Sequence, residues 1–261
     1  MNISYKNKVV VVTGGASGIG KEIVKAYLKS KATVVFCDVN LDKINESLKE
    51  FKKISDFVFG YKCDVSNSNN IDSFIKRLVK KFKCVDIFVN NAGIMPRMGV
   101  LNCEEKIIDQ MFSVNVKSIL LFGKHFPKLI NRGGVVLNAA SIAALIPTTT
   151  SAIYSASKAA VITISKCMAA ELAPYGIRVL SYAPGFVKTD RNMKKSGIEL
   201  KNKQIALRRP AEMKEITSCL LLLSSDYASY MTGSNIEITG GKFCVQNPDI
   251  VWSEVEKWNI N

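Results

Sequence analysis

The sequence is poor in the residues that build metal and disulfide sites. Its single histidine, His125, excludes a multi-histidine metal centre. Its neighbours Lys124 and Phe126 indicate an ordinary helix position, which argues against most serine–histidine–aspartate mechanisms. Its seven cysteines are an odd number and include no Cys-x-x-Cys pair. We therefore expect no metal, no disulfide framework and a reducing compartment.

Long apolar runs are absent too. The longest, such as Val9–Val12 and Leu220–Leu223, fall far short of the roughly 18–20 residues that cross a bilayer. No apolar core of a signal peptide follows the first eight residues. Because 48% of the residues are hydrophobic, as in folded proteins, these absences predict a cytoplasmic protein with no membrane partner.

Acidic residues are scarce beside basic ones, 22 against 36, which gives a formal charge of +14. A nucleic acid or another polyanion is one partner that such a charge would fit. However, 29 of the basic residues are lysine, a bias that codon usage alone can produce, and no recognisable nucleic-acid-binding motif occurs. We expect no nucleic-acid partner.

The chain alternates short β-branched runs with longer amphipathic stretches and has no internal repeat or linker. This alternation predicts one α/β domain over residues 1–261, a doubly wound parallel sheet with helices on both faces. Ligands of such folds bind beyond the carboxyl ends of the strands. The expected strands are 8–13, 33–38, 56–62, 85–89, 134–139, 178–182 and 235–238, and the expected helices are 18–30, 41–53, 68–82, 104–130, 152–173 and 211–224.

A glycine-rich turn follows the first expected strand, at residues 13–20. Its spacing is G-x-x-x-G-x-G, not the common G-x-G-x-x-G fingerprint. Glycines let the backbone approach a pyrophosphate, whose charge is favoured at the start of the next helix. The turn therefore indicates a dinucleotide site, with a purely structural tight turn as the alternative. Its candidate cofactor residues are Gly14, Ser17, Gly18, Ile19 and Gly20.

The second expected strand ends in an acid, Asp38, 18 residues after Gly20. A carboxylate there accepts the adenosine ribose hydroxyls of NAD and repels the 2′-phosphate of NADP. Neither Ser17 nor Val39 is basic, so neither offsets that repulsion. NAD is the predicted cofactor; the alternative is that Asp38 only caps the helix that begins near Leu41.

Two further segments follow the third and fourth expected strands, where the edge of a bound cofactor would run. They are Asp64-Val65 and Asn90-Asn91-Ala92-Gly93. The structural alternatives are a turn role for Asp64 and hydrogen bonds from Asn90 to main-chain groups.

Tyr154 and Lys158 lie four residues apart, on one face of an expected helix. An ammonium group near a phenol stabilises the phenolate and lowers the tyrosine pKa from about 10, which gives a general acid/base usable near neutral pH. Ser141 ends the fifth strand, where its hydroxyl can bond a substrate oxygen. Asn115 stands in mid-helix among apolar neighbours, a poor place for asparagine unless it has a polar task.

Taken in order, these motifs resemble those of the short-chain dehydrogenase/reductase family over residues 6–243. The matching pieces are Thr-Gly-x-x-x-Gly-x-Gly at 13–20, Asn-Asn-Ala-Gly at 90–93, Asn115, Ser141, Tyr154-x-x-x-Lys158, Pro184-Gly185 and Thr189. One departure is Thr239-Gly240-Gly241, where the family often has Asp-Gly-Gly. The resemblance implies a seven-stranded, mostly parallel Rossmann-like sheet and an Asn-Ser-Tyr-Lys tetrad. It also implies a dimer or tetramer assembled through the 104–130 and 152–173 helices and the last strand.

The resemblance implies roles for individual residues as well. Tyr154 would exchange the proton, Lys158 would lower its pKa and hold the nicotinamide ribose, and Ser141 would orient the substrate oxygen. Asn115 would hold a water that continues the proton path from Lys158. Around the cofactor, Asp64 and Val65 would meet the adenine, Asn91, Ala92 and Gly93 would line the adenosine and ribose side, and Pro184, Gly185, Val187 and Thr189 would border the nicotinamide.

Substrate specificity is implied to come from the segment after Pro184-Gly185. Residues 188–210 carry eight basic and two acidic side chains, which would attract an anionic or carrier-linked ketone unless they form only a solvated lid. The tail at 245–261 could cover a pocket or a subunit contact. The other pocket walls are expected from the loops 94–101 and 142–151, with Met95, Pro96, Met98, Leu145, Ile146, Pro147 and the hydroxyls of Thr148, Thr149 and Thr150.

The leading interpretation is an NAD(H)-dependent oxidoreductase that interconverts a secondary alcohol and a ketone. A 3-oxoacyl-carrier reductase is the nearest alternative; the resemblance would then imply NADPH, which Asp38 opposes. A non-catalytic dinucleotide sensor or scaffold is the alternative from another class, but it has no need for Tyr154 paired with Lys158.

Overall fold

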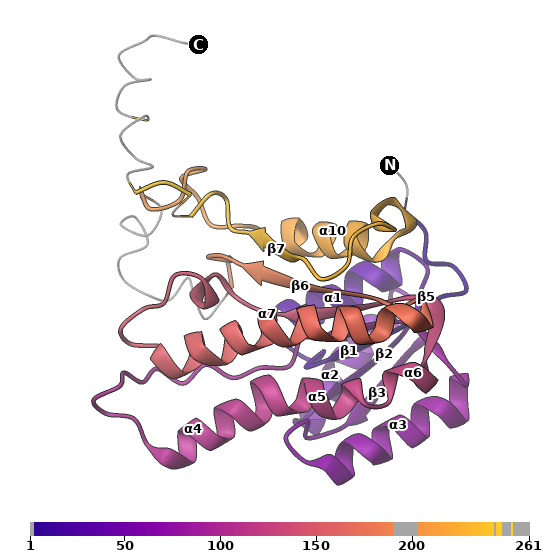
Figure 1. The fold of residues 1–261 in the computed structure, drawn as a ribbon. Helices are drawn as coiled ribbons and strands as arrows, with labels where there is room; N and C mark the ends of the chain where they lie inside the picture. Colours follow the sequence, from indigo (N-terminus) through magenta and orange to yellow (C-terminus); the bar gives the residue numbers. More distant parts are fainter. Residues whose placement is uncertain (1–2, 190–202, 243, 247–251, 253–261) are drawn as a thin grey trace.

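The computed structural model describes residues 3–189, 203–242, 244–246 and 252 (Figure 1). Most of the expected specificity segment, at 190–202, lies outside the described residues. So does most of the expected tail, at 247–251 and 253–261.

Seven strands form one sheet in the order β3-β2-β1-β4-β5-β6-β7, and every neighbouring pair is parallel. The chain winds outward from β1 to β3, then returns to place β4 beside β1, so the topological switch point lies between these two strands. This arrangement confirms the predicted doubly wound sheet. The strands are β1 (Val9–Thr13), β2 (Thr33–Asp38), β3 (Val58–Lys62), β4 (Val85–Asn90), β5 (Ile130–Ala139), β6 (Arg178–Pro184) and β7 (Asn235–Ile238).

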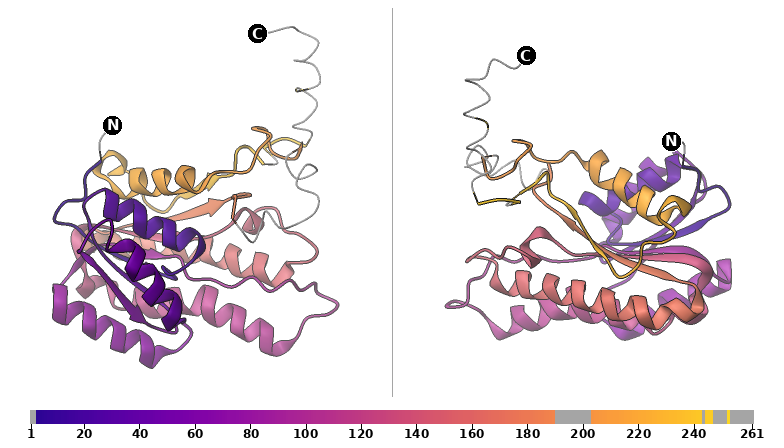
Figure 2. Two further views of the ribbon diagram at one scale, coloured as in Figure 1. Left: turned by 180° about the vertical axis from the view of Figure 1, so that it is seen from behind. Right: turned by 45° about the horizontal axis from the view of Figure 1, so that its top comes forward.

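The strands are buried on both faces, which explains their nearly continuous apolar sequences. Val10 and Val12 of β1 pack into one core, whereas Val11 between them packs into the other, as the two-residue period of a strand requires. Figure 2 shows the sheet between its two layers of helices. The Val10 face is covered by α1 (Gly18–Lys29), α2 (Leu41–Phe51) and α10 (Met213–Ser224), and the Val11 face by α3 (Ser68–Phe82), α5 (Ser118–Gly123), α6 (Phe126–Leu129) and α7 (Ala152–Leu172).

The stretch expected as one helix over 104–130 is divided in the structure. It begins as α4 (Glu105–Phe112), passes through a π-helical turn (Ser113–Lys117), continues as α5 and stops at Lys124. Pro127 then lies in the first turn of the short α6, where its missing N–H costs nothing. The expected end at 130 is wrong, because Ile130 already belongs to β5.

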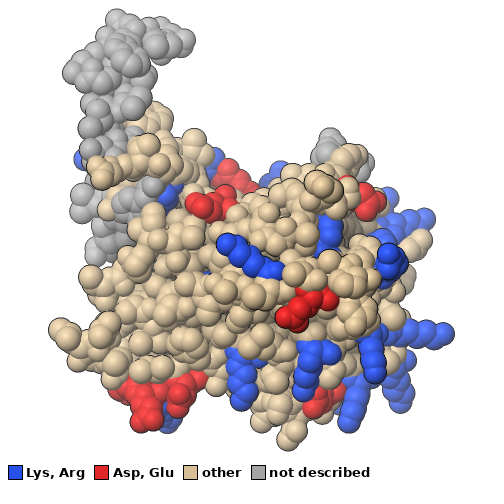
Figure 3. Space-filling view, viewed as in Figure 1, with Lys and Arg blue, Asp and Glu red and all other residues tan. Residues whose placement is uncertain are grey.

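Basic side chains gather on the right-hand side of Figure 3, over the C-terminal half of α3. Some of these cations rest on aromatic rings of β3: Arg77 lies 5.8 Å from the centre of the Tyr61 ring, and Lys81 lies 4.1 Å from that of Phe59. A helix that follows a parallel strand runs back toward the amino ends of the sheet, so this charge lies away from the carboxyl ends. In the part of the chain that the structure describes, no helix has the length and apolar character to cross a bilayer.

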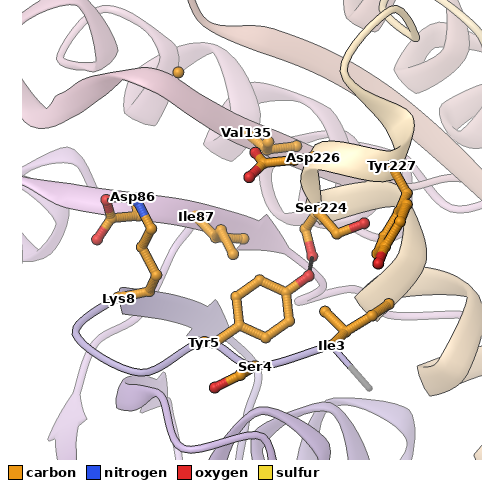
Figure 4. Close-up of a pocket in the computed structure, with 12 residues that line it drawn as sticks. Ile3, Ser4, Tyr5, Lys8, Asp86, Ile87, Val135, Ser224, Asp226 and Tyr227 are labelled. Atoms are coloured by element: carbon orange, nitrogen blue, oxygen red, sulfur yellow. Dashed lines mark hydrogen bonds and ion pairs between the residues drawn. The ribbon is translucent and has the colours of Figure 1, made fainter. Parts of the chain in front are cut away.

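At the amino ends of the strands, the structure has a pocket of about 320 Å³ (Figure 4). Tyr5 points toward α10, where its hydroxyl lies 2.7 Å from Ser224 Oγ; the Tyr27 hydroxyl lies equally close to the same atom. Burial raises the pKa of Tyr5 to about 12, so its hydroxyl keeps its proton. Asp86 accepts the N–H of Val9 at 2.8 Å and forms an ion pair with Lys8 at 3.2 Å. The polar groups at this end therefore bind one another.

Candidate active site

Two adjoining hollows lie beyond the carboxyl ends of the strands, as the fold predicts. The cofactor hollow, of about 1220 Å³, follows β1 to β4, and the substrate hollow, of about 500 Å³, follows β4 to β6. They share five lining residues, so they form one continuous cleft. The shared residues are Ile19, Asn91, Gly93, Ile94 and Thr189.

The glycine turn after β1 forms one wall of the cofactor hollow. Gly14 and Gly18 have φ values of +65° and +55°, a conformation that only glycine adopts readily. A Cβ on Gly20 would collide with the carbonyl oxygen of Gly14, whereas one on Gly18 would point into open space. Ser17 begins α1 without a side-chain cap, which leaves the first-turn N–H groups of this helix directed at the cleft. Backbone donors at an open helix start fit an anionic pyrophosphate.

Asp38 lines the cofactor hollow and anchors the glycine turn. Its carboxylate accepts the N–H of Ala16 at 3.2 Å and the N–H of Asn40 at 3.2 Å. The cap of α2 is Asn40, whose side chain accepts the N–H of Lys43 at 2.9 Å. The alternative in which Asp38 merely caps this helix is therefore wrong.

Thr13 and Asn91 join the ends of β1 and β4. The Thr13 hydroxyl accepts the N–H groups of Asn91 and Ala92, both at 3.0 Å, while the Asn91 amide donates to the Thr13 carbonyl at 3.1 Å. Asn90 instead turns into the sheet and donates to Asn138 at 2.7 Å. Asn91, Ala92 and Gly93 thus line the cleft, and Asn90 has an internal structural role.

Asp64 and Val65 also line the cofactor hollow. Asp64 accepts the N–H and the hydroxyl of Ser66 at 2.9 and 2.7 Å, the contacts of a turn residue. Contact of these two residues with an adenine stays a prediction.

Lys158 brings a cation into the interior beside Tyr154. Its side chain is buried, and its Nζ donates to the carbonyl of Ala139 at 2.6 Å and lies 5.9 Å from the centre of the Tyr154 ring. Burial lowers the pKa of Lys158 from 10.5 to about 8. Tyr154, Lys158 and Ser141 all line the substrate hollow. Ser141 also begins a short 3₁₀ turn, where its Oγ accepts the N–H of Ala143 at 3.2 Å.

Asn115 is buried in the π-helical turn, a feature that often marks functional positions. Its amide accepts the N–H of Ile94 at 2.9 Å and donates to the Ile94 carbonyl and to Ser157 Oγ, both at 3.0 Å. A Cβ built on Gly93 would lie 3.2 Å from Asn115 Oδ1 and 3.4 Å from Lys158 Nζ, so these three residues adjoin. The side chain contacts protein groups, and a role in a water-mediated proton path stays a prediction.

The end of β6 closes the substrate hollow. Gly185 donates its N–H to Ile238 of β7 at 2.9 Å, and a Cβ there would lie 2.8 Å from Thr239 Cα, so this close approach requires glycine. Val187 pairs with Ala211 in an isolated bridge. All four residues expected beside a nicotinamide line this hollow: Pro184, Gly185, Val187 and Thr189.

The structure thus gathers every predicted site residue around one cleft, with Asn115 alone set behind its wall. The expected substrate loops contribute less: Met95, Thr148 and Thr150 line the hollow, whereas Pro96, Met98, Leu145, Ile146, Pro147 and Thr149 do not. Sequence reasoning missed Arg97, Phe186 and Lys242, which do. A charged residue inside the apolar loop 94–101 was the available signal for Arg97.

A model of the family described as short chain dehydrogenase matches residues 8–199. The chain belongs to the short-chain dehydrogenase/reductase family. An oxidoreductase of Thermotoga maritima described as uncharacterised is 32% identical over 256 residues, which cover 93% of this chain and all of the relative. A 3-oxoacyl-[acyl-carrier-protein] reductase of the same organism is 32% identical over 240 residues, 90% of this chain and 98% of that one.

A solved structure of L-sorbose reductase from Gluconobacter frateurii, complexed with NADPH and L-sorbose, superposes with a TM-score of 0.87 at 25% identity. The match covers 94% of this chain and all of the other. The chain is thus an oxidoreductase of the short-chain dehydrogenase/reductase family, which acts on CH–OH groups with a nicotinamide dinucleotide.

Proposed function

We propose that this short-chain dehydrogenase/reductase interconverts a secondary alcohol and a ketone with NAD(H), using Tyr154 as the general acid/base. The observation that carries the proposal is the meeting of Tyr154, Ser141 and buried Lys158 in a hollow continuous with the glycine-turn cleft. A scaffold or sensor would gain nothing from a buried cation beside a phenol, since burying a charge is costly.

The cofactor hollow has the features that a dinucleotide requires. The open first turn of α1, with Gly14, Ser17, Gly18, Ile19 and Gly20, would hold the pyrophosphate. Asp64 and Val65 would flank the adenine, and the riboses would lie against Asn91, Ala92 and Gly93. The nicotinamide would be bordered by Pro184, Gly185, Val187 and Thr189. The nicotinamide, when bound, supplies or accepts the hydride.

Asp38 supports NAD over NADP. Its carboxylate lies in the hollow after β2, where it would accept ribose hydroxyls and repel a 2′-phosphate. Three of the lysines that line the same hollow are already paired and so offer little compensation to a phosphate: Lys21 and Lys25 with Glu50, at 2.6 Å each, and Lys188 with Glu212, at 3.1 Å. Lys43, which also lines it, forms no ion pair among the described residues.

The proton moves at Tyr154. In reduction the phenol would donate its proton to the substrate oxygen, and in oxidation the phenolate would take it back, with Ser141 holding that oxygen by a hydrogen bond. Lys158 would stabilise the phenolate electrostatically. At neutral pH, below its pKa of about 8, the ammonium form still predominates. Asn115 would act as a positioning residue, because it fixes Ile94 and Ser157 beside the reacting groups.

A 3-oxoacyl-carrier reductase is the second candidate, favoured by the relative of that name in Thermotoga maritima. Asp38 argues against the NADPH preference that we would expect with that activity.

We further propose a small-molecule substrate, an anionic one included, and no nucleic-acid or membrane partner. Assembly as a homodimer or homotetramer and a cytoplasmic location remain predictions from the sequence.

The test is a screen of ketones and secondary alcohols with NAD(H) and NADP(H), followed by nicotinamide absorbance. We expect turnover that prefers NAD(H) and that disappears in Tyr154→Phe. NADH binding without turnover of any compound, measured by fluorescence titration, would instead support the sensor alternative.

A further inference from the structure

The two hollows differ in their charged lining residues. The cofactor hollow mixes Lys21, Lys25, Lys43 and Lys188 with Glu22, Asp38 and Asp64. The substrate hollow is lined by Arg97, Lys158 and Lys242, and no aspartate or glutamate is among its described lining residues. A site lined by cations alone favours a ligand with negative charge.

Several cations near the cleft already interact with another side chain of the protein. Lys188 pairs with Glu212 at 3.1 Å, Arg209 pairs with Glu215 at 2.7 Å, and Arg208 lies 5.5 Å from the centre of the Trp252 ring. Among the described residues, no aspartate or glutamate forms an ion pair with the exposed Arg97 guanidinium. Part of the charge expected to attract a substrate at 188–210 is thus already neutralised.

The loop that carries Arg97 is fixed at both ends. At its start, Ile94 is held by Asn115 through hydrogen bonds of 2.9 and 3.0 Å. At its end, Met98 donates its N–H to Thr150 at 2.9 Å and forms a parallel bridge with Ser151, which directly precedes α7. Tyr154 lies in the first turn of α7, so Arg97 is anchored close to the reacting residue on a pre-ordered segment. Pre-ordering lowers the entropy that binding must remove.

We propose that Arg97 recognises an anionic group, a carboxylate or a phosphate, on the ketone or alcohol that reacts at Tyr154. This inference rests on the proposed oxidoreductase function and names the substrate class for the same site. A guanidinium presents paired N–H donors that match either oxyanion. The apolar neighbours Ile94, Met95, Ile142 and Phe186 would exclude water from the bound substrate, which strengthens the attraction.

The test uses pairs of compounds in which one member has an anionic group and the other is its neutral counterpart. Straight-chain 2-, 3- and 4-oxo acids are compared with their methyl esters, and dihydroxyacetone phosphate with dihydroxyacetone. We expect one charged series to show the higher kcat/KM, and which one does distinguishes carboxylate from phosphate recognition. In Arg97→Gln, kcat/KM for the preferred anion should fall about 10- to 100-fold, the range for one charged hydrogen-bonded pair, while its neutral partner changes less than about twofold.

Two further variants sharpen the comparison. Arg97→Lys keeps the charge but not the planar fork, so it should retain part of the preference. Arg132→Gln removes an exposed arginine of β5 outside both hollows, and should leave kcat/KM for both members of each pair unchanged. Equal losses for charged and neutral partners in Arg97→Gln, or no loss for either, would overturn the inference.

Calorimetric binding of the same compounds in the presence of NADH separates this inference from the proposed function. Anions that bind the wild type more tightly than Arg97→Gln, without being turned over, would support the Arg97 site and reject the reaction. Turnover of neutral ketones, together with anion binding that Arg97→Gln does not weaken, would support the reaction and reject the Arg97 site.

Discussion

The two ends of the sheet use similar residues for different purposes. Each end has a tyrosine, a lysine and an aspartate: Tyr5, Lys8 and Asp86 at the amino end, and Tyr154, Lys158 and Asp38 at the carboxyl end. At the amino end these groups bind one another or nearby protein groups. At the carboxyl end they line a cleft several times larger.

The lysines show the difference most clearly. Lys8 has a side chain that is 54% exposed and is paired with Asp86, so its charge costs little. Lys158 is 4% exposed, and its Nζ donates to a carbonyl oxygen. A cation kept in the interior at a cost to stability indicates a task that the fold itself does not require. The predictions below test this contrast, from the largest expected effect to the smallest.

The largest effect should come from the tyrosine of the carboxyl end. Tyr154→Phe removes the proposed proton donor, so kcat should fall by about 10²- to 10⁴-fold, the usual contribution of general acid–base catalysis. NADH affinity and thermal stability should stay near those of the wild type. Steady-state kinetics and fluorescence titration check this, and turnover close to wild type would exclude the assigned role.

The buried lysine should make stability depend on pH. Lys158 has a pKa of about 8 in the folded chain and an ordinary value near 10.5 when unfolded, so the unfolded chain binds more protons between these values. Its charge penalty is therefore full below pH 8 and disappears as the pH rises toward 10.5.

Lys158→Met provides the reference, because it lacks this titration. Relative to the variant, the wild type should gain up to about 3 kcal/mol of unfolding free energy between pH 7 and pH 10.5. Urea denaturation of both proteins across this range measures the gain. Parallel stability curves would show that Lys158 does not carry a buried charge.

Substitutions of Asp38 and Asp86 should have different effects, the first on the choice of cofactor and the second on stability. Asp38→Ala should shift the ratio of NADPH to NADH affinity toward NADPH by about tenfold, or 1.4 kcal/mol, because the repulsion of the 2′-phosphate is removed. Asp86→Ala at the other end should lower stability and leave this ratio unchanged. Fluorescence titration with both reduced cofactors decides, and an unchanged ratio in Asp38→Ala would contradict the NAD assignment.

The smallest effect should come from the tyrosine of the amino end. Tyr5→Phe loses hydrogen bonds to Ser224 and to the Leu221 carbonyl, so the free energy of unfolding should fall by about 1 kcal/mol. Activity per folded molecule should not change. A loss of kcat would mean that the pocket in Figure 4 communicates with the cleft.

The same contrast explains which features could be predicted from the sequence. The strands could be predicted, because each is a short β-branched run buried on both faces. The glycine turn could be predicted as well, because backbone sterics at Gly14 and Gly20 set its spacing. The division of the expected helix at 104–130 into shorter helices could not be predicted, since the apolar pattern continues through Pro127 into β5. The partners of Asn90 and Asp64 depend on neighbours distant in the chain, such as Asn138, or on local turn geometry.

The substrate wall was the least predictable part. Its members were expected from apolar character, yet neither Leu145 nor Met98 lines the hollow. Leu145 is 42% exposed, and the Met98 sulfur accepts the N–H of Glu104. The direction of a loop side chain follows from hydrogen bonds such as that of Met98 to Thr150, which no periodic pattern records.

In the π-helical turn at Ser113–Lys117, the position of Asn115 depends on the number of residues in the turn as well as on their identity. Such a turn accommodates one residue more than an α-helix, and each residue of an α-helix advances by about 100°. Deleting a single residue there would restore a regular helix but rotate Asn115 away from Ile94 and Ser157. A homologue that keeps this asparagine in a helix one residue shorter would therefore lack the hydrogen bonds that hold Ile94, at the start of the loop that carries Arg97. A sequence alignment would still score the asparagine as identical.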